Sequence, residues 1–552
     1  MKAPSTAVFA SLSSTITEIC RLSGIPGVAI GVIDNGEIIH QASYGFCDVE
    51  KQIPCDSDTT FVLGSLTKAF TSTLLAQLVQ DGRLNWTDPL SQILPEFQRD
   101  PQDLSSHTTI GDLLCHHTGL SAFDSLWLGS DNVPLLNRSD AIQILNYVPQ
   151  QEPFRGSFIY NNFAYEVLGH VIEKISGMTY SSFLQERLLR PLGMKKTYYT
   201  DPAKQIENEA KPYFALSDAT PFRIPPALHG DGVLMGPAGG VRSCVSDLLI
   251  FYDALLGAAA EEIELGAGEK HSPKEHPVSF SELPTMWTGW NILPMPLIRE
   301  HSYGYGWLRS QLPTVLAPSR GDPKLNPLVG LGAPSRLAIW HSGDIPGYQT
   351  HATLFPETKQ AVVVLTNSLS LNDGSRYIND LIIKALLDNL DNAHDYAELA
   401  KKSADLALTR VGSIHKRLID GQTRSKPCRP LDSYVGRYFN AVKNFFIDIG
   451  LNEEGNLYLS FMGRKRDTFE LTTYQDDRFF WFLTHDEAAK LARYDGYGED
   501  FYILNFRSSN RDKDVIDTLW WRHEPSLPDL GELFERQPAP DNLTAGKVPS
   551  EL

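Results

Sequence analysis

Alternating and periodic apolar positions predict strands at both ends of the first 390 residues and helices between them. Two strand-like runs, residues 28–34 and 37–44, flank Asn35-Gly36, the dipeptide most typical of a tight hairpin turn. Strand patterns return at 336–341, 351–355 and 360–367, and helical spacing appears from Ser65 to Val79 and at 110–114, 138–147, 162–175 and 376–390. This order predicts an α+β domain: a mixed or antiparallel sheet flanked by helices, with an all-helical insertion.

A second pattern begins after a helical, charged stretch that leads into polar, proline-containing sequence. Seven short β-rich runs lie between residues 434 and 522, at the spacing of a small antiparallel barrel or sandwich. We therefore expect a first domain over 1–392, a helical linker over 393–430, a C-terminal β-barrel-like domain over 431–540 and a tail over 541–552. Residues 257–277 show little pattern and are interpreted as a mobile surface insertion.

Composition narrows the classes of function. The 552 residues are 42% hydrophobic, which excludes wholesale disorder, and a net charge of −18 argues against nucleic acid as a partner. No apolar run approaches the ~18 residues of a membrane-spanning helix, so no membrane partner is expected. Residues 1–23 lack the apolar core of a secretory signal. A cytoplasmic protein is expected; its six scattered cysteines are expected to be free thiols, although an even count permits disulfides.

The first candidate catalytic motif is Gly64-Ser65-Leu66-Thr67-Lys68. If a helix opens at Ser65, Lys68 lies one turn further on the same face, where its amine could take the serine proton. A helix amino terminus also offers a positive dipole end to a developing oxyanion. Alone the motif is weak, because the same spacing recurs at Ser413 and Lys416 and most instances are solvated helix faces.

Two later motifs strengthen it by their order along the chain. Tyr160-Asn161-Asn162 places a phenol and an amide just before a predicted helix, and His341-Ser342-Gly343 follows a predicted strand. Each has decoys elsewhere: Tyr377 and Tyr438 also begin a Tyr-x-Asn triplet, and His117 begins a His-x-Gly triplet. The order of nucleophile helix, tyrosine motif and strand motif is therefore the informative feature.

These motifs resemble the serine β-lactamase and penicillin-binding protein superfamily, in the branch of class C β-lactamases, D-aminopeptidases, family VIII esterases and lovastatin-type acyltransferases. Agreement extends over about residues 20 to 392. Besides the three motifs, it includes Asp112 to Leu120, Leu168-Gly169, Pro191 to Met194, Pro237 to Ser243 and Asp247-Leu248. The resemblance implies a β-lactamase-like first domain, and the last 120 residues resemble, more loosely, a β-barrel that some members carry.

The resemblance also implies roles for individual residues. Ser65 would be the acylated nucleophile, Lys68 its proton partner and Tyr160 the second acid/base, and which of the two accepts the serine proton stays open. Asn162 would bind Lys68 and a substrate carbonyl. The backbone N–H groups of Ser65 and Asp344, the residue after Gly343, would form the oxyanion hole. No metal and no cofactor is implied.

One position departs from the β-lactamase pattern. His341 stands where β-lactamases of this branch carry a lysine that helps hold the substrate carboxylate. A neutral imidazole attracts a carboxylate less, although it can donate a hydrogen bond. The Asp344 carboxylate either adds negative charge at the pocket mouth or points to solvent. We therefore expect an ester, thioester or amide of an intracellular small molecule as substrate, and not a penicillin.

Other readings remain open at this stage. Acyl transfer to a small-molecule alcohol or amine is the alternative to hydrolysis, and a non-catalytic binding protein is a third possibility. Residues 303–307 form either a packed turn or a substrate loop; His116 and His117 are interpreted as structural, and Trp520-Trp521 as barrel core. If the barrel governs access to the cleft, deleting the residues after Asp420 should change the substrate range. The oligomeric state is not predicted.

Overall fold

The chain divides into two compact units. The computed structural model describes residues 6–99, 102–199, 207–266, 277–295, 298–317, 322–387, 394–423, 426–508 and 515–537. The first unit comprises Met1–Gly119 and Glu152–Leu406, and the second comprises Leu120–Gln151 and Ala407–Leu552. Leu120–Gln151 is called the inserted segment below.

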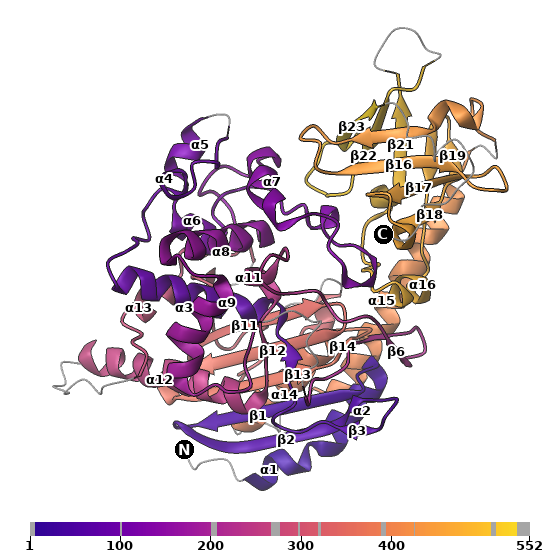
Figure 1. Ribbon diagram of the computed structural model, residues 1–552. Helices are drawn as coiled ribbons and strands as arrows, with labels where there is room; N and C mark the ends of the chain where they lie inside the picture. The colour runs from indigo at the N-terminus through magenta and orange to yellow at the C-terminus, as the bar shows by residue number, and fades with distance from the viewer. Residues whose placement is uncertain are drawn as a thin grey trace. The chain divides into compact units, whose positions relative to one another are not determined.

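A nine-stranded sheet organises the first unit (Figure 1). Its order is β3-β2-β1-β13-β12-β11-β10-β9-β8, and each described pairing is antiparallel. Its strands are β1 (Gly27–Asp34), β2 (Glu37–Asp48), β3 (Ile53–Pro54), β8 (Asn291–Ile292), β9 (His301–Tyr303), β10 (Leu308–Gln311), β11 (Leu337–Ile345), β12 (Tyr348–Phe355) and β13 (Gln360–Thr366). The predicted hairpin is confirmed: Asn35 and Gly36 have φ of 51° and 76°, the left-handed values that such a turn requires.

The two faces of this sheet carry different layers. Val28, Ile30 and Val32 of β1 join the core cluster that packs under α1 (Thr6–Ser11), α2 (Ser13–Ser23) and α14 (Gly374–Leu386). Gly31 points to the other face, where a Cβ would lie 2.6 Å from Val245 of α12 (Val245–Gly266). The helical region lies on this second side (Figure 1). The fold class predicted from the sequence, a helix-flanked sheet with a helical insertion, is confirmed.

The helical region contains α3 and α8, which lie together beside α11. Its helices are α3 (Thr67–Gln80), α4 (Leu90–Ile93), α5 (Gln102–His107), α6 (Ile110–Leu114), α8 (Asn162–Ser176), α9 (Tyr180–Leu184), α10 (Arg190–Leu192), α11 (Gly236–Gly239) and α13 (Leu283–Met286). Short strands complete the unit: β4 (Phe61–Val62) pairs with β7 (Arg242–Ser243), and β5 (Tyr213–Ala215) lies between β6 (Pro221–Arg223) and β14 (Ser368–Leu369).

The expected insertion at 257–277 is partly wrong. Residues 257–266 are the last turns of α12, while 267–276 lie outside the described residues. The sequence here is Gly-Ala-Ala-Ala-Glu-Glu, and alanine and glutamate are strong helix formers, so the chain extends the preceding helix.

The second unit holds a nearly closed antiparallel barrel, as the sequence predicted. Its strand order is β18-β17-β16-β15-β23-β22-β21-β20-β19. The strands are β15 (Gly436–Phe439), β16 (Phe446–Leu451), β17 (Leu457–Phe461), β18 (Thr468–Glu470), β19 (Thr472–Gln475), β20 (Arg478–Phe480), β21 (Ile503–Arg507), β22 (Thr518–Trp521) and β23 (Glu532–Gln537), with helix α16 (His485–Lys490) between β20 and β21. Leu471 alone separates β18 from β19, so the two edges of the sheet must meet. β23 and α16 were not predicted.

The domain boundaries differ from those expected at 392 and 430. Helix α15 (Tyr396–Asp420) is the predicted charged helix, but the division between units falls inside it, at Leu406. The inserted segment, which includes α7 (Ala141–Tyr147), belongs with the barrel although it was placed in the first domain. The expected tail, 541–552, lies outside the described residues.

Two expectations from the sequence concerned membrane-spanning helices and disulfides. In the part of the chain that the structure describes, no helix has the length and apolar character to cross a membrane. All six cysteines are free thiols, as expected; five are buried and Cys428 is exposed.

A buried histidine on β12 leads to a prediction about acid stability. His351 is fully buried and stacked 5.7 Å from Trp340, and burial followed by the charge of Arg376 lowers its pKa to about 3. An unfolded histidine titrates near 6.5, so as pH falls below that value the unfolded chain takes up a proton that the folded chain refuses. His351 therefore stabilises the fold fully above pH 6.5 and progressively less down to about pH 3.

We expect His351→Phe, which keeps a stacked ring, to lose less stability on acidification than the wild type. The difference in unfolding free energy should change by about 1.4 kcal/mol per pH unit within that window. Urea unfolding measured from pH 4 to 8 gives this difference. Taking the difference between the two proteins cancels the opposite contribution of Asp380, whose pKa burial raises to about 7 in both of them. Parallel stability curves for the two proteins would contradict the prediction.

Candidate active site

Ser65 lies at a sharp turn between a strand and a helix. β4 ends at Val62, a 3-10 turn spans Gly64–Leu66, and α3 begins at Thr67. Gly64 has φ of 55°, and a Cβ there would lie 3.0 Å from the backbone nitrogen of Asp344, so a larger residue would meet both backbone strain and a steric clash. The turn leaves Ser65 half-buried at the start of the helix, as the sequence predicted.

Lys68 is fully buried and directed at the serine. Its Nζ donates to Asn162 Oδ1 at 2.8 Å, to the carbonyl of Ala238 at 2.9 Å and to Ser65 Oγ at 3.0 Å. The amide oxygen and the carbonyl can only accept, so they fix two N–H bonds and direct the remaining tetrahedral position at Ser65 Oγ. A neutral Lys68 would therefore present its lone pair to the serine hydroxyl.

Tyr160 approaches the same oxygen from the irregular stretch just before α8 (Asn162–Ser176). Its hydroxyl donates to Ser65 Oγ at 2.8 Å, and Lys68 Nζ lies 4.8 Å from the centre of its ring. Asn161 caps α8 by accepting from the N–H of Ala164, which leaves Asn162 in the first turn facing Lys68. The structure thus brings together Ser65, Lys68, Tyr160 and Asn162, and two groups able to accept a proton touch one hydroxyl.

Strand β11 passes against this turn. Gly343 lies so close that a Cβ would be 2.1 Å from the carbonyl of Leu63 and 2.9 Å from the backbone nitrogen of Ser65. The same approach brings the Asp344 nitrogen beside Gly64. The two backbone nitrogens expected to form an oxyanion hole therefore lie on adjoining segments, and only glycine at 343 permits it.

His341 lies on the same face of β11 but is not free to bind a carboxylate. Its Nδ1 lies 2.6 Å from the carbonyl of Ser342, so this nitrogen carries the proton, and its Nε2 accepts from the hydroxyl of Tyr303 at 3.0 Å. Burial, then the charge of Lys68, lowers the pKa of His341 to about 3, so the ring is neutral at pH 7. The neutral imidazole expected from the sequence agrees with this pKa. The ring has no N–H left to donate to a substrate, because its one N–H, on Nδ1, already faces the carbonyl of Ser342.

The carboxylate of Asp344 does not enlarge the site's negative charge. Side chains alternate along a strand, so Asp344 points to the face opposite His341 and Gly343. Its register partner on β12 is Gln349, and the Asp344 side chain is exposed. Of the two orientations left open by the sequence, the structure favours the one away from the pocket, because the alternation of β11 fixes it.

Two residues behind the site were underestimated from the sequence. His116, interpreted as structural, has its ring 4.5 Å from that of Tyr160, and its Nδ1 accepts the N–H of Asn161 at 3.1 Å. Tyr303, the first residue of the aromatic–glycine loop, is fully buried and 4.8 Å from His116. The loop is thus a packed turn whose first residue supports the site. The available signal for His116 was its place within the matching stretch Asp112 to Leu120.

The other candidates lie elsewhere. Ser413 Oγ donates to the carbonyl of Thr409 within α15, and Lys416 pairs with Asp420, so this second Ser-x-x-Lys motif is a helix surface. Trp521 is buried in the barrel, as expected, whereas Trp520 is half-buried. Among the residues described, no three His, Cys, Asp or Glu side chains gather in a way that could hold a metal ion.

Comparisons with known proteins find relatives in sequence. A family model described as Beta-lactamase matches residues 14–387. The Unguisins hydrolase ungD of Aspergillus violaceofuscus is 26% identical over 450 residues, which cover 77% of this chain and 74% of the relative. Protein flp of Staphylococcus aureus is 28% identical over 209 residues, 37% of this chain and 41% of the relative.

Solved structures show the same fold. The octameric penicillin-binding protein homologue from Pyrococcus abyssi superposes with a TM-score of 0.54 at 20% identity, covering 96% of this chain and all of that one. A penicillin-binding protein from Bacillus halodurans gives a TM-score of 0.50 at 22% identity, over 67% of this chain and 98% of that one.

Proposed function

This chain belongs to the beta-lactamase family of serine hydrolases, and on that premise we propose that it hydrolyses an uncharged ester or amide of a small molecule through an acyl-Ser65 intermediate. The observation that carries the proposal is the Ser65 hydroxyl, hydrogen-bonded at once to Lys68 Nζ and to Tyr160 Oη. A binding protein has no physical need for two proton-accepting groups hydrogen-bonded to one half-buried serine.

The proposed chemistry has two halves. In the first, the Ser65 proton passes to Lys68 or Tyr160 while Ser65 Oγ bonds to the acyl carbon, and the carbonyl oxygen becomes an oxyanion beside the N–H groups of Ser65 and Asp344. The oxyanion collapses, the alcohol or amine leaves, and it takes up the proton that the serine lost. In the second half, water attacks the acyl-Ser65 ester by the reverse proton path and releases the acid.

The substrate class follows from what faces the serine. The position where a lysine would hold a substrate carboxylate carries a neutral, fully engaged His341. A carboxylate brought there would lose its hydration without gaining a cation, which is costly. An ester, thioester or neutral amide carries no such cost, so we place these above penicillins as substrates.

Hydrolysis is favoured over transfer by the relative that covers most of the chain. That protein is named a hydrolase, and the match spans three quarters of both sequences. Transfer of the acyl group to an alcohol or amine would use the same catalytic residues. The experiment below therefore distinguishes water from an alcohol or amine as the acyl acceptor.

The test is intact-mass spectrometry after incubation with p-nitrophenyl esters and with a fluorophosphonate probe. We expect a single adduct per chain, located at Ser65 by peptide mapping, and release of free acid from the ester. Adding small alcohols or amines distinguishes transfer, since new esters or amides would then appear. Absence of any adduct on the folded protein would move the assignment to a binding protein.

A second prediction concerns Tyr160. We expect Tyr160→Phe to lower kcat for ester hydrolysis by about 10²-fold or more, as for a lost acid/base, while the fold is retained. Steady-state kinetics with p-nitrophenyl acetate measures this. Tyr377→Phe is the matched control, because Tyr377 is also buried, donates to the carbonyl of Leu325 and begins a Tyr-x-Asn triplet. Equal turnover in the two variants would remove Tyr160 from the mechanism.

A further inference from the structure

The inserted segment leaves the first unit between two parts of the candidate site. The chain passes into the second unit after Gly119, three residues beyond His116, and returns at Glu152, eight residues before Tyr160. Residues 152–161 contain no helix or strand. The position of Tyr160 therefore depends on how the ends of this irregular stretch are held.

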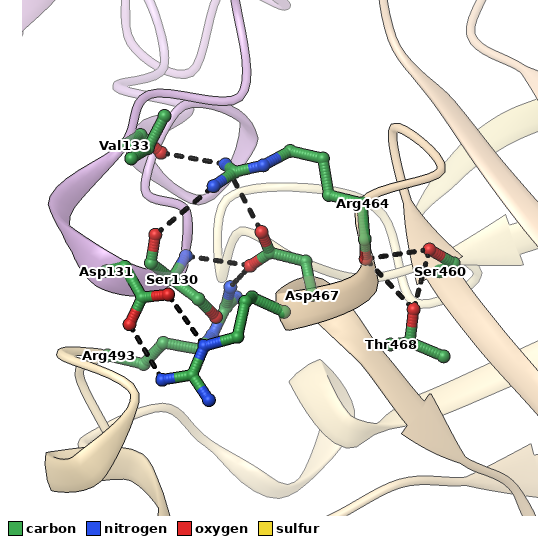
Figure 2. A network of polar contacts seen from close by, with 9 residues as sticks. Ser130, Asp131, Val133, Ser460, Arg464, Asp467, Thr468 and Arg493 are labelled. Atoms are coloured by element: carbon green, nitrogen blue, oxygen red, sulfur yellow. Dashed lines mark hydrogen bonds and ion pairs between the residues drawn. The ribbon is translucent and has the colours of Figure 1, made fainter. Parts of the chain in front are cut away.

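A buried ionic hub holds the inserted segment to the barrel (Figure 2). The fully buried carboxylate of Asp467 accepts the N–H of Ser130 at 2.7 Å and a bond from Arg493 at 2.5 Å. Arg464 pairs with the other oxygen of Asp467 at 3.2 Å and donates to the carbonyl of Val133 at 3.0 Å. Beside the hub, Arg466 forms a two-pronged pair with Asp131, with distances of 2.6 and 2.8 Å.

A second buried cluster also joins the inserted segment to the barrel. Tyr147 donates to Glu532 at 2.8 Å, Glu532 lies 2.5 Å from His523, and His523 lies 2.6 Å from Ser125. Serine, histidine and glutamate in line resemble a hydrolytic triad in composition. However, Ser125 is only 4% exposed, so the cluster joins the segment to the barrel and offers no accessible nucleophile.

Hydrogen bonds continue from the segment into the loop that carries Tyr160. At the second unit's end, the N–H of Ser121 donates to the carbonyl of Pro149 at 3.1 Å; at the first unit's end, the N–H of Glu152 donates to the carbonyl of Gly119 at 3.2 Å. The same two stretches of the chain are joined further on, where the N–H of Arg155 donates to the carbonyl of His117 at 2.8 Å. The series ends where Asn161 donates to His116.

We propose that the second unit is a positioning device for Tyr160, acting through the Asp131–Arg466 pair and the Asp467 hub. These contacts fix the inserted segment. The segment in turn fixes the distance between Gly119 and Glu152, where the chain leaves and re-enters the first unit, and that distance fixes the loop before α8. Asp131, Arg466 and Asp467 are positioning residues and touch no reacting atom. The proposal rests on the proposed function, in which Tyr160 transfers a proton.

The test is a charge reversal in the full-length protein. Arg466→Glu and Asp131→Arg each break the pair, and the double variant restores it with the charges exchanged. Both side chains are partly exposed, at 54% and 19%, so the single variants keep the core intact. Arg417→Glu is the matched control, because it makes the same charge change at the similarly exposed Arg417–Glu499 pair, whose two residues lie in the second unit but outside the inserted segment.

We expect each single variant to lower kcat about tenfold or more per fluorophosphonate-titrated site, with KM within about twofold, and the double variant to recover most of the loss. The amides of Arg155 and Asn161 should exchange faster in the single variants and regain protection in the double variant. A merely structural role would lower the yield of folded protein without changing kcat per titrated site.

Unchanged kcat per titrated site in both single variants overturns the proposal. If the wild type neither hydrolyses esters nor reacts with the probe, the proposed function fails instead, and amide exchange alone then decides. Exchange at Arg155 and Asn161 that is indifferent to the charge reversals would overturn the positioning role in that case.

Discussion

Replacing Ser65 with alanine should abolish both the covalent adduct and turnover, with a loss of at least about 10⁴-fold in kcat, the scale found when a catalytic nucleophile is removed. The oxygen that is lost is the acceptor shared by Lys68 Nζ and Tyr160 Oη, so no other hydroxyl can take its place in this geometry. The fold should survive, because removing one half-buried hydroxyl creates no large cavity. Intact-mass spectrometry and p-nitrophenyl ester hydrolysis measure both outcomes.

The second Ser-x-x-Lys motif supplies the internal control. Ser413→Ala should leave labelling and turnover unchanged, since Ser413 only donates to the carbonyl of Thr409 on α15. Loss of activity in Ser413→Ala with retention in Ser65→Ala would reverse the assignment of the nucleophile.

Ending the chain at Asp420 should leave the first unit unable to fold to a soluble, active form. The inserted segment would remain, but its partners would be gone: Phe123 packs edge-on against His523 at 4.7 Å, and the Ser130 N–H is bound by Asp467. Apolar side chains of the segment that are now fully buried include Phe123, Leu126, Ile144 and Leu145. Each contributes about 1.5–3 kcal/mol when buried, against a total stability of about 5–15 kcal/mol for a typical domain.

This expectation replaces the one drawn from the sequence, that such a deletion would change the substrate range. Soluble yield, binding of a hydrophobic dye and protease cleavage within residues 120–151 measure the outcome. A chain that also lacks 120–151, with Gly119 joined to Glu152 by a short glycine linker, is the informative control, because it removes the orphaned segment. Recovery of a well-folded, dye-negative protein from the simple truncation would show that the segment does not need the barrel.

Much of the fold and of the site could be predicted because it depends on local sequence. The Asn35-Gly36 turn, the helix after Ser65 and the cap at Asn161 each follow from a few adjacent residues, and the order of the three motifs indicated which serine matters. Local chemistry also indicated a barrel, because short strands with regular turns leave few alternatives.

What could not be predicted depends on pairing between distant parts of the chain. The engagement of His341 requires Tyr303 from β9, and the approach of Gly343 to the backbone of Ser65 requires β11 to pass against the turn before α3. The inserted segment has the apolar spacing of any helical connection, and nothing within it indicates that its partner is the barrel. The helical end of α12 is different: its alanine and glutamate content was sufficient to predict a helix.

The split second unit has a consequence for how the protein is made. Ser130 and Asp467 are 337 residues apart, so at about 5–20 residues per second the ribosome needs roughly 20–70 s to supply the partner. By the end of that interval the nucleophile, Tyr160 and all nine strands of the first sheet have been synthesised, while residues 120–151 still present their apolar side chains to water. The nascent chain therefore carries a defined segment for chaperones to bind, and the second unit closes only after Asp467 and the later barrel strands have been synthesised.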